Sequence, residues 1–163
     1  MSLPSPTVRN TPPIAPMKDG HRSMFTFANA ATISVWEKGM KPMGMDGGDM
    51  IDVNTMHTGT WFQQWPRAII RTTPLNVRVG YITSQYPIIR QQINVNQAIT
   101  QWFPSSHWVT FYGVLRLFDP EEMVEGTQPE AQMVLEATHW DPVGNVEHGP
   151  AWGTSGVSGT GTV

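Results

Sequence analysis

Five histidines are the residues of this chain that could hold a metal ion: His21, His57, His107, His139 and His148. None of them stands at the HxH, HxxxH or HExxH spacing that brings two imidazoles to one ion. The chain has no cysteine, which excludes disulfides, cysteine-based zinc sites and a cysteine nucleophile. We therefore expect neither a metal site nor a cofactor.

Carboxylates are the other groups that could do chemistry. The segment from Asp46 to Asp49 has the glycines of a calcium loop, but its twelfth position is His57 instead of the required Glu. Four acids between residues 119 and 125 could act as general acids or bases, although such a run is more often solvated or faces an arginine partner. The chain has no GxSxG or GxxxxGK[ST] motif, and its one GxGxxG-like run lies in the C-terminal tail. We expect that the protein is not an enzyme.

Seven tryptophans could form a platform for a carbohydrate or for single-stranded nucleic acid. Packing in the core or at a subunit interface is the competing interpretation, because tryptophan is enriched at both places. Trp61 and Trp65 flank Phe62 just after an expected strand. This grouping favours a subunit interface.

The composition indicates one β-rich domain. The chain has 163 residues, of which 14% are charged, against about 25% in an average soluble domain. A coiled coil would need more Ala, Glu, Lys and Leu, and a disordered chain would not carry so many aromatic residues. No stretch is long and apolar enough for a membrane span. Residues 1–16 lack the apolar core of a secretory signal, so we expect synthesis in a cytoplasm.

Charge is segregated along the chain. Residues 53–118 hold five arginines and no acid, whereas residues 119–163 hold eight acids and no Lys or Arg. The two segments could neutralise each other within one fold. Alternatively, the chain could present a basic face to one neighbour and an acidic face to another, as in a repeating assembly. Five scattered arginines do not make the basic stripe of a nucleic-acid-binding domain.

The hydrophobic pattern predicts about seven strands and one helix. Strands are expected over 24–31, 32–37, 50–55, 74–82, 98–103, 108–118 and 130–138. A short helix is expected over about 85–94, because Tyr86, Ile89 and Ile93 share one helical face and Pro87 suits a first turn. Residues 38–49, rich in glycine and methionine, are expected to form a long loop.

The expected architecture is mainly β, a small β-sandwich or partial barrel with the one helix against it. This domain would span residues 23–142. A Pro-rich extended arm over residues 1–22 precedes it, and a flexible Gly/Thr-rich tail over residues 143–163 follows it. Such arms gain no burial in a monomer, which favours a partner surface.

A series of short motifs occurs in a characteristic order. The run Ile51 to Met56 leads to the aromatic and proline segment Trp61 to Pro66, and then to a strand and the helix with Tyr86 to Ile89. A hairpin with Phe103-Pro104 and Phe111-Tyr112-Gly113 follows, and Asp141-Pro142 ends the last strand. In this order the motifs resemble the major tail tube proteins of long-tailed bacteriophages. The resemblance covers about two-thirds of the chain.

The resemblance implies a structural protein of the virion tail. Six subunits would form a ring, and rings would stack into a hollow tube through which double-stranded DNA passes without lasting binding. The partners would be other copies of the chain and the tape-measure, terminator and tip or baseplate proteins, with no membrane. The tail would assemble in the cytoplasm of the host bacterium.

The resemblance also suggests roles for three groups of residues. Candidates for the loop that contacts the next ring are Met40, Lys41, Met43, Met45, Asp46 and Asp49. Candidates for the subunit interface are Trp61, Phe62, Trp65, Arg71 and Arg78. Candidates for the lumen are Glu130, Gln132 and Glu136, although Glu130 and Glu136 could equally face an arginine of a neighbour.

Two alternatives remain open at this point. A capsid decoration protein or a tail terminator would also be small and β-rich, but the first would not form rings by itself and the second would form one ring that does not stack. A carbohydrate-binding module that uses exposed tryptophans would be monomeric and would respond to sugar.

Overall fold

The computed structural model describes residues 23–154, apart from residues 34, 58 and 105. The sequence-predicted N-terminal arm, residues 1–22, and the last part of the predicted tail, residues 155–163, lie outside the described residues. Among the described residues, no helix is both long enough and apolar enough to cross a membrane.

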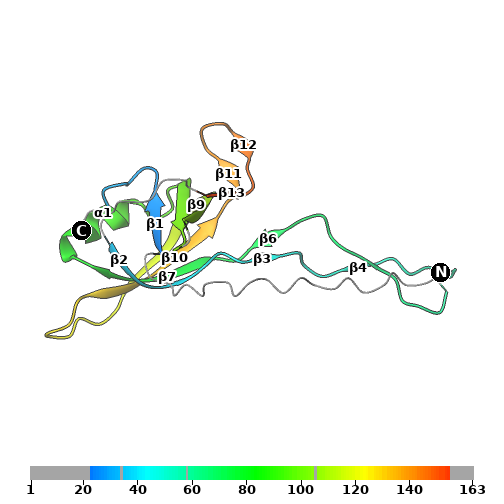
Figure 1. Cartoon of the computed structure of the whole chain (residues 1–163), viewed down its shortest axis with the longest axis horizontal. Coiled ribbons are helices and arrows are strands. Elements are labelled where there is room, and N and C mark those ends of the chain that lie inside the picture. The colour runs from blue at the N-terminus through cyan, green and yellow to red at the C-terminus, as the bar shows by residue number, and fades with distance from the viewer. Residues whose placement is uncertain (1–22, 34, 58, 105, 155–163) are drawn as a thin grey trace.

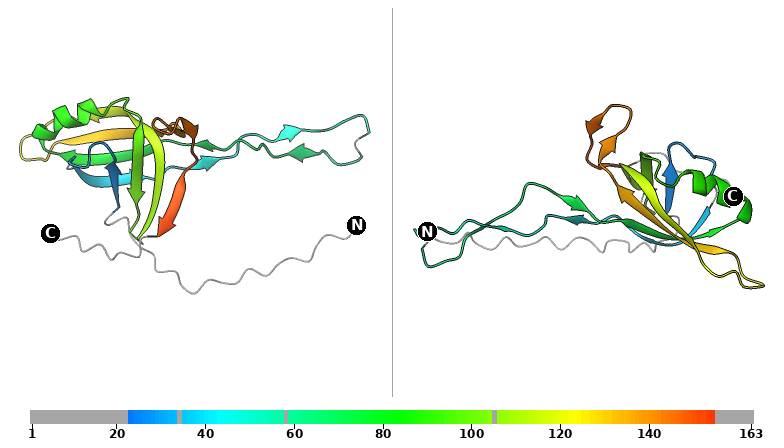
Figure 2. Two further views of the ribbon diagram at one scale, coloured as in Figure 1. Left: turned by 90° about the horizontal axis from the view of Figure 1, so that it is seen from above. Right: turned by 180° about the vertical axis from the view of Figure 1, so that it is seen from behind.

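One antiparallel sheet organises the domain. Its strands are β1 (Met24–Phe27), β2 (Val35–Lys41), β7 (Leu75–Tyr81), β8 (Gln97–Trp102), β9 (His107–Pro120) and β10 (Glu130–Ala137). They lie in the order β1-β8-β9-β10-β7-β2, and β13 (Ala151–Thr154) pairs with the first part of β9. The sheet curls into a half-barrel (Figure 2). The expectation of a mainly β partial barrel is confirmed.

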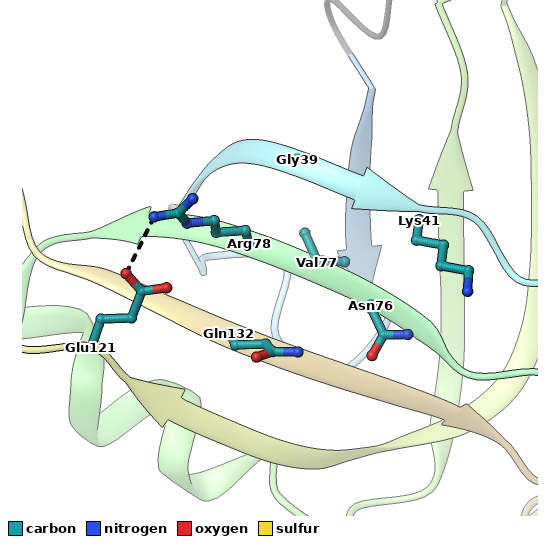
Figure 3. Close-up of a pocket in the computed structure, with 7 residues that line it drawn as sticks. All are labelled: Gly39, Lys41, Asn76, Val77, Arg78, Glu121 and Gln132. Atoms are coloured by element: carbon teal, nitrogen blue, oxygen red, sulfur yellow. Dashed lines mark hydrogen bonds and ion pairs between the residues drawn. The ribbon is translucent and has the colours of Figure 1, made fainter.

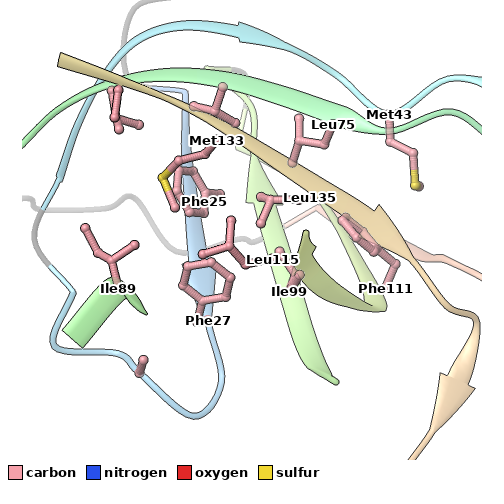
Figure 4. Packing of buried hydrophobic residues seen from close by; sticks show 14 of the residues in the cluster. Phe25, Phe27, Met43, Leu75, Ile89, Ile99, Phe111, Leu115, Met133 and Leu135 are labelled. Carbon is pink, nitrogen blue, oxygen red and sulfur yellow. The ribbon is translucent and has the colours of Figure 1, made fainter. Parts of the chain in front are cut away.

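Alternation along the strands fills the inside of the half-barrel. On β7, Leu75, Val77, Val79 and Tyr81 point inward and are almost completely buried. Leu115 of β9 and the inward residues of β10 complete the same cluster (Figure 4). Period-two alternation puts one face of each strand in the core and leaves the other face for polar residues.

One short helix covers the open side of the half-barrel. A 3₁₀ turn (Thr83–Gln85) leads into α1 (Tyr86–Gln91), with Pro87 in its first turn where a missing N–H costs nothing. Ile89 is fully buried against the core (Figure 4). The helix predicted over about 85–94 is confirmed, although it ends a few residues earlier.

The β2–β7 hairpin continues far beyond the sheet as a thin ribbon (Figure 1). The short strands β3 (Met45–Asp46) and β6 (Arg71–Thr72) pair near its base, and β4 (Ile51–Asp52) and β5 (Gln64–Trp65) pair nearer its tip. We call residues 42–74 the hairpin arm. The segment 38–49, expected as a loop, is thus the end of β2 followed by one side of this arm. Its partner strand begins about 20 residues later, beyond the range of local periodicity.

The C-terminal part of the described chain is more regular than the sequence indicates. β11 (Trp140–Asp141) and β12 (Val146–Glu147) form a small hairpin, and β13 then returns to β9. Asn145 adopts a positive φ of 56° in the connecting turn. Strands β12 and β13 thus lie within the range 143–163 that the sequence analysis assigned to a tail. The strand β13 was hard to predict because glycine is rare in strands. Gly153 is nevertheless needed there, since it lies directly against the ring of Trp108.

We predict that Gly113→Ala destabilises the domain. A Cβ at Gly113 would lie 2.6 Å from the backbone oxygen of Glu136, in a core that cannot open easily. Overpacking of this kind costs about 1–3 kcal/mol in the free energy of unfolding. Gly39→Ala is the matched control, because it lies on β2 with no atom within 4 Å of its Cβ, and it should change stability by less than about 0.5 kcal/mol. Urea denaturation of both variants tests this, and equal midpoints would contradict it.

Candidate functional site

The hairpin arm is held together by few interactions. Its two ladders contain two residue pairs each. On the base side of the first ladder, the Thr73 amide donates to the Gly44 carbonyl at 2.9 Å, and on the tip side of the second, the Val53 amide donates to the Gln63 carbonyl at 3.3 Å. Among the described residues, no third strand pairs with the arm on either side (Figures 1 and 2). A two-stranded ribbon of this kind is marginally stable in water without a partner surface.

Large apolar side chains of the arm are exposed. Trp61 is 84% exposed, and Phe62 and Trp65 are each 67% exposed. The other exposed apolar residues of the arm are Met45, Met50, Ile51, Val53, Met56, Ile69 and Ile70. A monomer rarely exposes a contiguous apolar patch above a few hundred Å², so such a patch usually marks an interaction surface.

The two sides of the arm carry opposite charges. The first side bears Asp46, Asp49 and Asp52, and the second bears Arg67 and Arg71. Asp46 lies opposite Arg71 in the ladder. No ion pair within 4 Å forms between these groups among the described residues. The arm is therefore polarised across its width, and both arginines keep their charge available to a partner.

The structure separates the candidate stacking residues into two groups. Met45, Asp46 and Asp49 lie exposed on the arm. Met43 is buried in the core, and the sulfur of the half-buried Met40 lies 3.1 Å from the Nε2 donor of Gln101. These two methionines pack within their own domain, where they are not available to a second copy. The remaining candidate, Lys41, lies on the outer face of the sheet.

The candidate interface residues are also separated. Trp61, Phe62, Trp65 and Arg71 lie on the second side of the arm. Arg78, by contrast, lies on the outer face of β7, where its guanidinium contacts Glu130 at 2.9 Å and Glu121 at 3.3 Å. Glu130 thus faces an arginine of its own chain, whereas the sequence-based alternative named an arginine of a neighbour.

The outer face of the sheet is polar and rich in ion pairs. Glu130 also pairs with Lys38, and Glu136 pairs with Arg116 at 3.0 Å. Gln132 lies between the two glutamates and is exposed. A shallow hollow of about 300 Å³ opens on this face, lined by Gly39, Lys41, Asn76, Val77, Arg78, Glu121 and Gln132 (Figure 3). The three candidate lumen residues therefore share one face of one strand.

Two carboxyl groups on either side of the sheet have opposite pKa shifts. The Lys38 ammonium bound to Glu130, together with Arg78, holds the pKa of that carboxyl below its usual 4.5. Glu37 points the other way, toward the gap between the sheet edges β1 and β2. There burial raises its pKa above 4.5, although the Phe25 amide donates to Glu37 Oε1 at 3.1 Å and partly opposes that rise. Glu37 thus joins the two edges of the half-barrel through a side chain.

The histidines do not form a metal centre in the part of the chain that the structure describes, where no three potential ligands gather. His139 instead lies with its Nε2 atom 2.9 Å from the Thr72 hydroxyl. This contact ties the base of the hairpin arm to the turn that follows β10. Sequence reasoning missed it, because residues 72 and 139 are far apart in the chain.

Several exposed arm residues were also missed, chiefly Met56, Ile69 and Ile70. Ile69 and Ile70 are adjacent, so their side chains would point to opposite faces of a strand. Both can be exposed only where neither face of that strand is covered, and the sequence alone does not show that. The one hint in the sequence is Pro66, which interrupts the apolar run between the aromatic cluster and the two isoleucines and disfavours a central strand there.

The comparison with solved structures finds a chain of similar fold, whereas the sequence comparisons find no match. No protein-family model and no curated protein matches the sequence. The fold is similar to that of a chain in the cryo-EM structure of the anti-feeding prophage baseplate, six-fold symmetrised. The TM-score is 0.52 at 8% identity, and the match covers 83% of this chain and 93% of that chain. At this identity the similarity establishes a shared fold only.

We predict that Glu130→Gln and Glu37→Gln alter the pH dependence of stability in opposite directions. Native Glu130 binds its proton less readily than the unfolded chain does, so its stabilising effect is present above about pH 4.5 and is lost as the pH falls below that value. Native Glu37 binds its proton more readily, so its ionisation costs stability as the pH rises above about 4.5. Urea denaturation between about pH 3.5 and pH 7 measures both effects.

At pH 7, Glu130→Gln should be less stable than the wild type, and Glu37→Gln more stable, because glutamine keeps an oxygen for the Phe25 amide without the buried charge. Both differences should shrink toward low pH. Parallel curves for the two variants would contradict the assignment of the two environments.

Proposed function

We propose that this protein is a structural subunit of a phage or phage-like tail, and that it assembles into hexameric rings that stack into a hollow tube. The observation that carries the proposal is the hairpin arm. It exposes Trp61, Phe62 and Trp65 at its second side, far from the core that could cover them. In a repeating assembly, a second copy of the chain would cover these side chains.

The shared fold supports the same proposal. The similar chain belongs to a six-fold symmetrised baseplate of a prophage. The tail tube resemblance of the motif order independently suggests a tail protein. We propose on these grounds that the role is structural and not catalytic, that the location is the virion tail, and that assembly occurs in the host bacterium. Further tail proteins, such as tape-measure, terminator and tip or baseplate proteins, would be its other partners.

The outer face of the sheet fits a lumen surface for DNA. Its arginines Arg78 and Arg116 are both paired with glutamates, which makes their charge less available to phosphate, and Lys41 is a further cation of this face. Gln132 adds an uncharged polar group. A face of this kind allows a polyanion to pass without lasting binding. We propose that Glu130, Gln132 and Glu136 line the lumen.

The direct test is negative-stain electron microscopy of the purified protein across a concentration series, with the mass measured by light scattering. Stacked rings or hollow tubes are the expected result. Single rings that never stack would instead indicate a terminator, and a monomer or trimer that binds only to a capsid would indicate a decoration protein. A monomer whose tryptophan fluorescence responds to sugar would indicate a carbohydrate-binding module.

We predict that Trp61→Ser/Phe62→Ser/Trp65→Ser abolishes stacking and leaves the domain folded, because none of the three side chains contributes to the core. The thermal midpoint should change by no more than a few degrees, since surface substitutions change stability by less than about 0.5 kcal/mol each. Val143→Ser is the control, since Val143 is also a largely exposed apolar residue but lies outside the arm. Undiminished tubes from the triple variant would remove the arm from the assembly.

A further inference from the structure

We propose that the second side of the hairpin arm (residues 61–72, here the basic arm strand) docks on the connection between β9 and β10 of another copy (residues 121–129, here the acidic end loop). This inference rests on the proposed function, because it names the surface that receives the arm in a stack. The occupant is a second copy of this chain.

The two segments lie at opposite ends of the molecule. The hairpin arm leaves one end of the sheet, and the acidic end loop extends from the other end, next to α1 (Figures 1 and 2). Every residue of the acidic end loop from Glu121 to Gln128 is exposed. Since the two surfaces differ and face opposite ways, a contact between them repeats from copy to copy without closing, which is the geometry of a filament.

Their charges are complementary and unused. Arg67 and Arg71 form no ion pair among the described residues, and neither do Glu122 and Glu125. Glu121 of the loop and Glu130 just after it differ from these two glutamates, since both hold Arg78. The first side of the arm carries three aspartates, so only the basic arm strand fits an acidic partner.

Their apolar surfaces also match. The acidic end loop exposes Met123 at 58% and Val124 at 56%, between the two unpaired glutamates. The basic arm strand places Ile69 and Ile70 between its two arginines in the same way. Methionine adapts to an irregular partner surface, which suits a loop that must receive bulky side chains. Each segment therefore presents an apolar centre between two like charges, and the signs are opposite.

The arm offers a large part of the area that a specific interface needs. Trp61, Phe62 and Trp65 at their observed exposure offer about 400 Å² on the arm, from the area that aromatic side chains usually bury. A standard interface buries about 800 Å² on each partner. The two isoleucines and the arginine stems supply much of the remainder. A charged rim around an apolar centre is the usual anatomy of such a contact.

The first experiment is charge reversal with rescue. Arg67→Glu/Arg71→Glu should raise the protein concentration needed for stacking by at least about tenfold, because two attractive pairs become repulsive at each contact. Glu122→Arg/Glu125→Arg should do the same. An equimolar mixture of the two variants restores the attractive pairs only where the two variants alternate along the stack. The quadruple variant restores them at every contact, and it should stack like the wild type at the same net charge. Arg90→Glu and Glu147→Arg are the controls, since both reverse exposed charges outside the two segments.

The second experiment locates the contact directly. A photo-crosslinking phenylalanine at Phe62, in a mixture of ¹⁵N-labelled and unlabelled chains, should yield links between labelled and unlabelled chains that end at residues 121–126. Mass spectrometry reads the position. The link should form in tubes and be absent at concentrations where the protein is monomeric.

The outcomes separate this inference from the proposed function. Tubes whose cross-links end elsewhere, or tubes that ignore both charge reversals, would overturn the docking surface and leave the tube intact. A wild-type chain that forms no rings or tubes at any concentration would overturn both. Loss of stacking in both double variants, with recovery in the quadruple variant, supports the docking surface.

Discussion

The exposure of apolar side chains on a ribbon of only two strands is the constraint on which the rest of the molecule depends. A ribbon cannot bury a tryptophan on its own, since it has no layer beneath it. Trp61 and Trp65 therefore remain in water until another surface arrives. The globular part must be stable without them, and it is, because its core is complete from β1 to β10 with α1 as cover.

The two faces of the sheet differ in polarity. Its inner face is closed by aliphatic and aromatic side chains, and its outer face balances cations against carboxylates. Arg78 forms ion pairs with two glutamates, which come from different ends of the β9–β10 connection. The ion pairs are exposed, so each adds little to stability. Their effect is on the surface potential, which they keep low without removing polarity.

The regular part of the fold could be predicted from the sequence, and the arm could not. Residues 74–82 and 130–138 alternate cleanly, so β7 and β10 were evident, as was a helix with Pro87 in its first turn. The pairing of Ile51 with Trp65 has no local signature, because it depends on where the chain reverses direction. β13 was hidden for a different reason: its glycine is required by Trp108, which only the folded neighbour reveals.

The candidate residues followed the same division. The residue types correctly singled out Trp61, Phe62 and Trp65 as a cluster, and all three are exposed. The burial of a residue could not be predicted in the same way, since Met43 belongs to the core while Met45, two residues later, is exposed. A two-residue spacing on a strand gives the same face, so only the departure of the arm from the sheet between these positions distinguishes them. That departure is a property of the three-dimensional fold.

The two short ladders of the arm have a mechanical consequence. The stretch between β3 and β4 on one side, and between β5 and β6 on the other, has no ladder pairing to stiffen it. A ribbon built this way flexes at a defined point, whereas its root is fixed to the domain by β2, β7 and the His139–Thr72 contact. Subunits joined through such arms would act like links with a compliant joint, and a column of them could curve under load while every joint stayed closed.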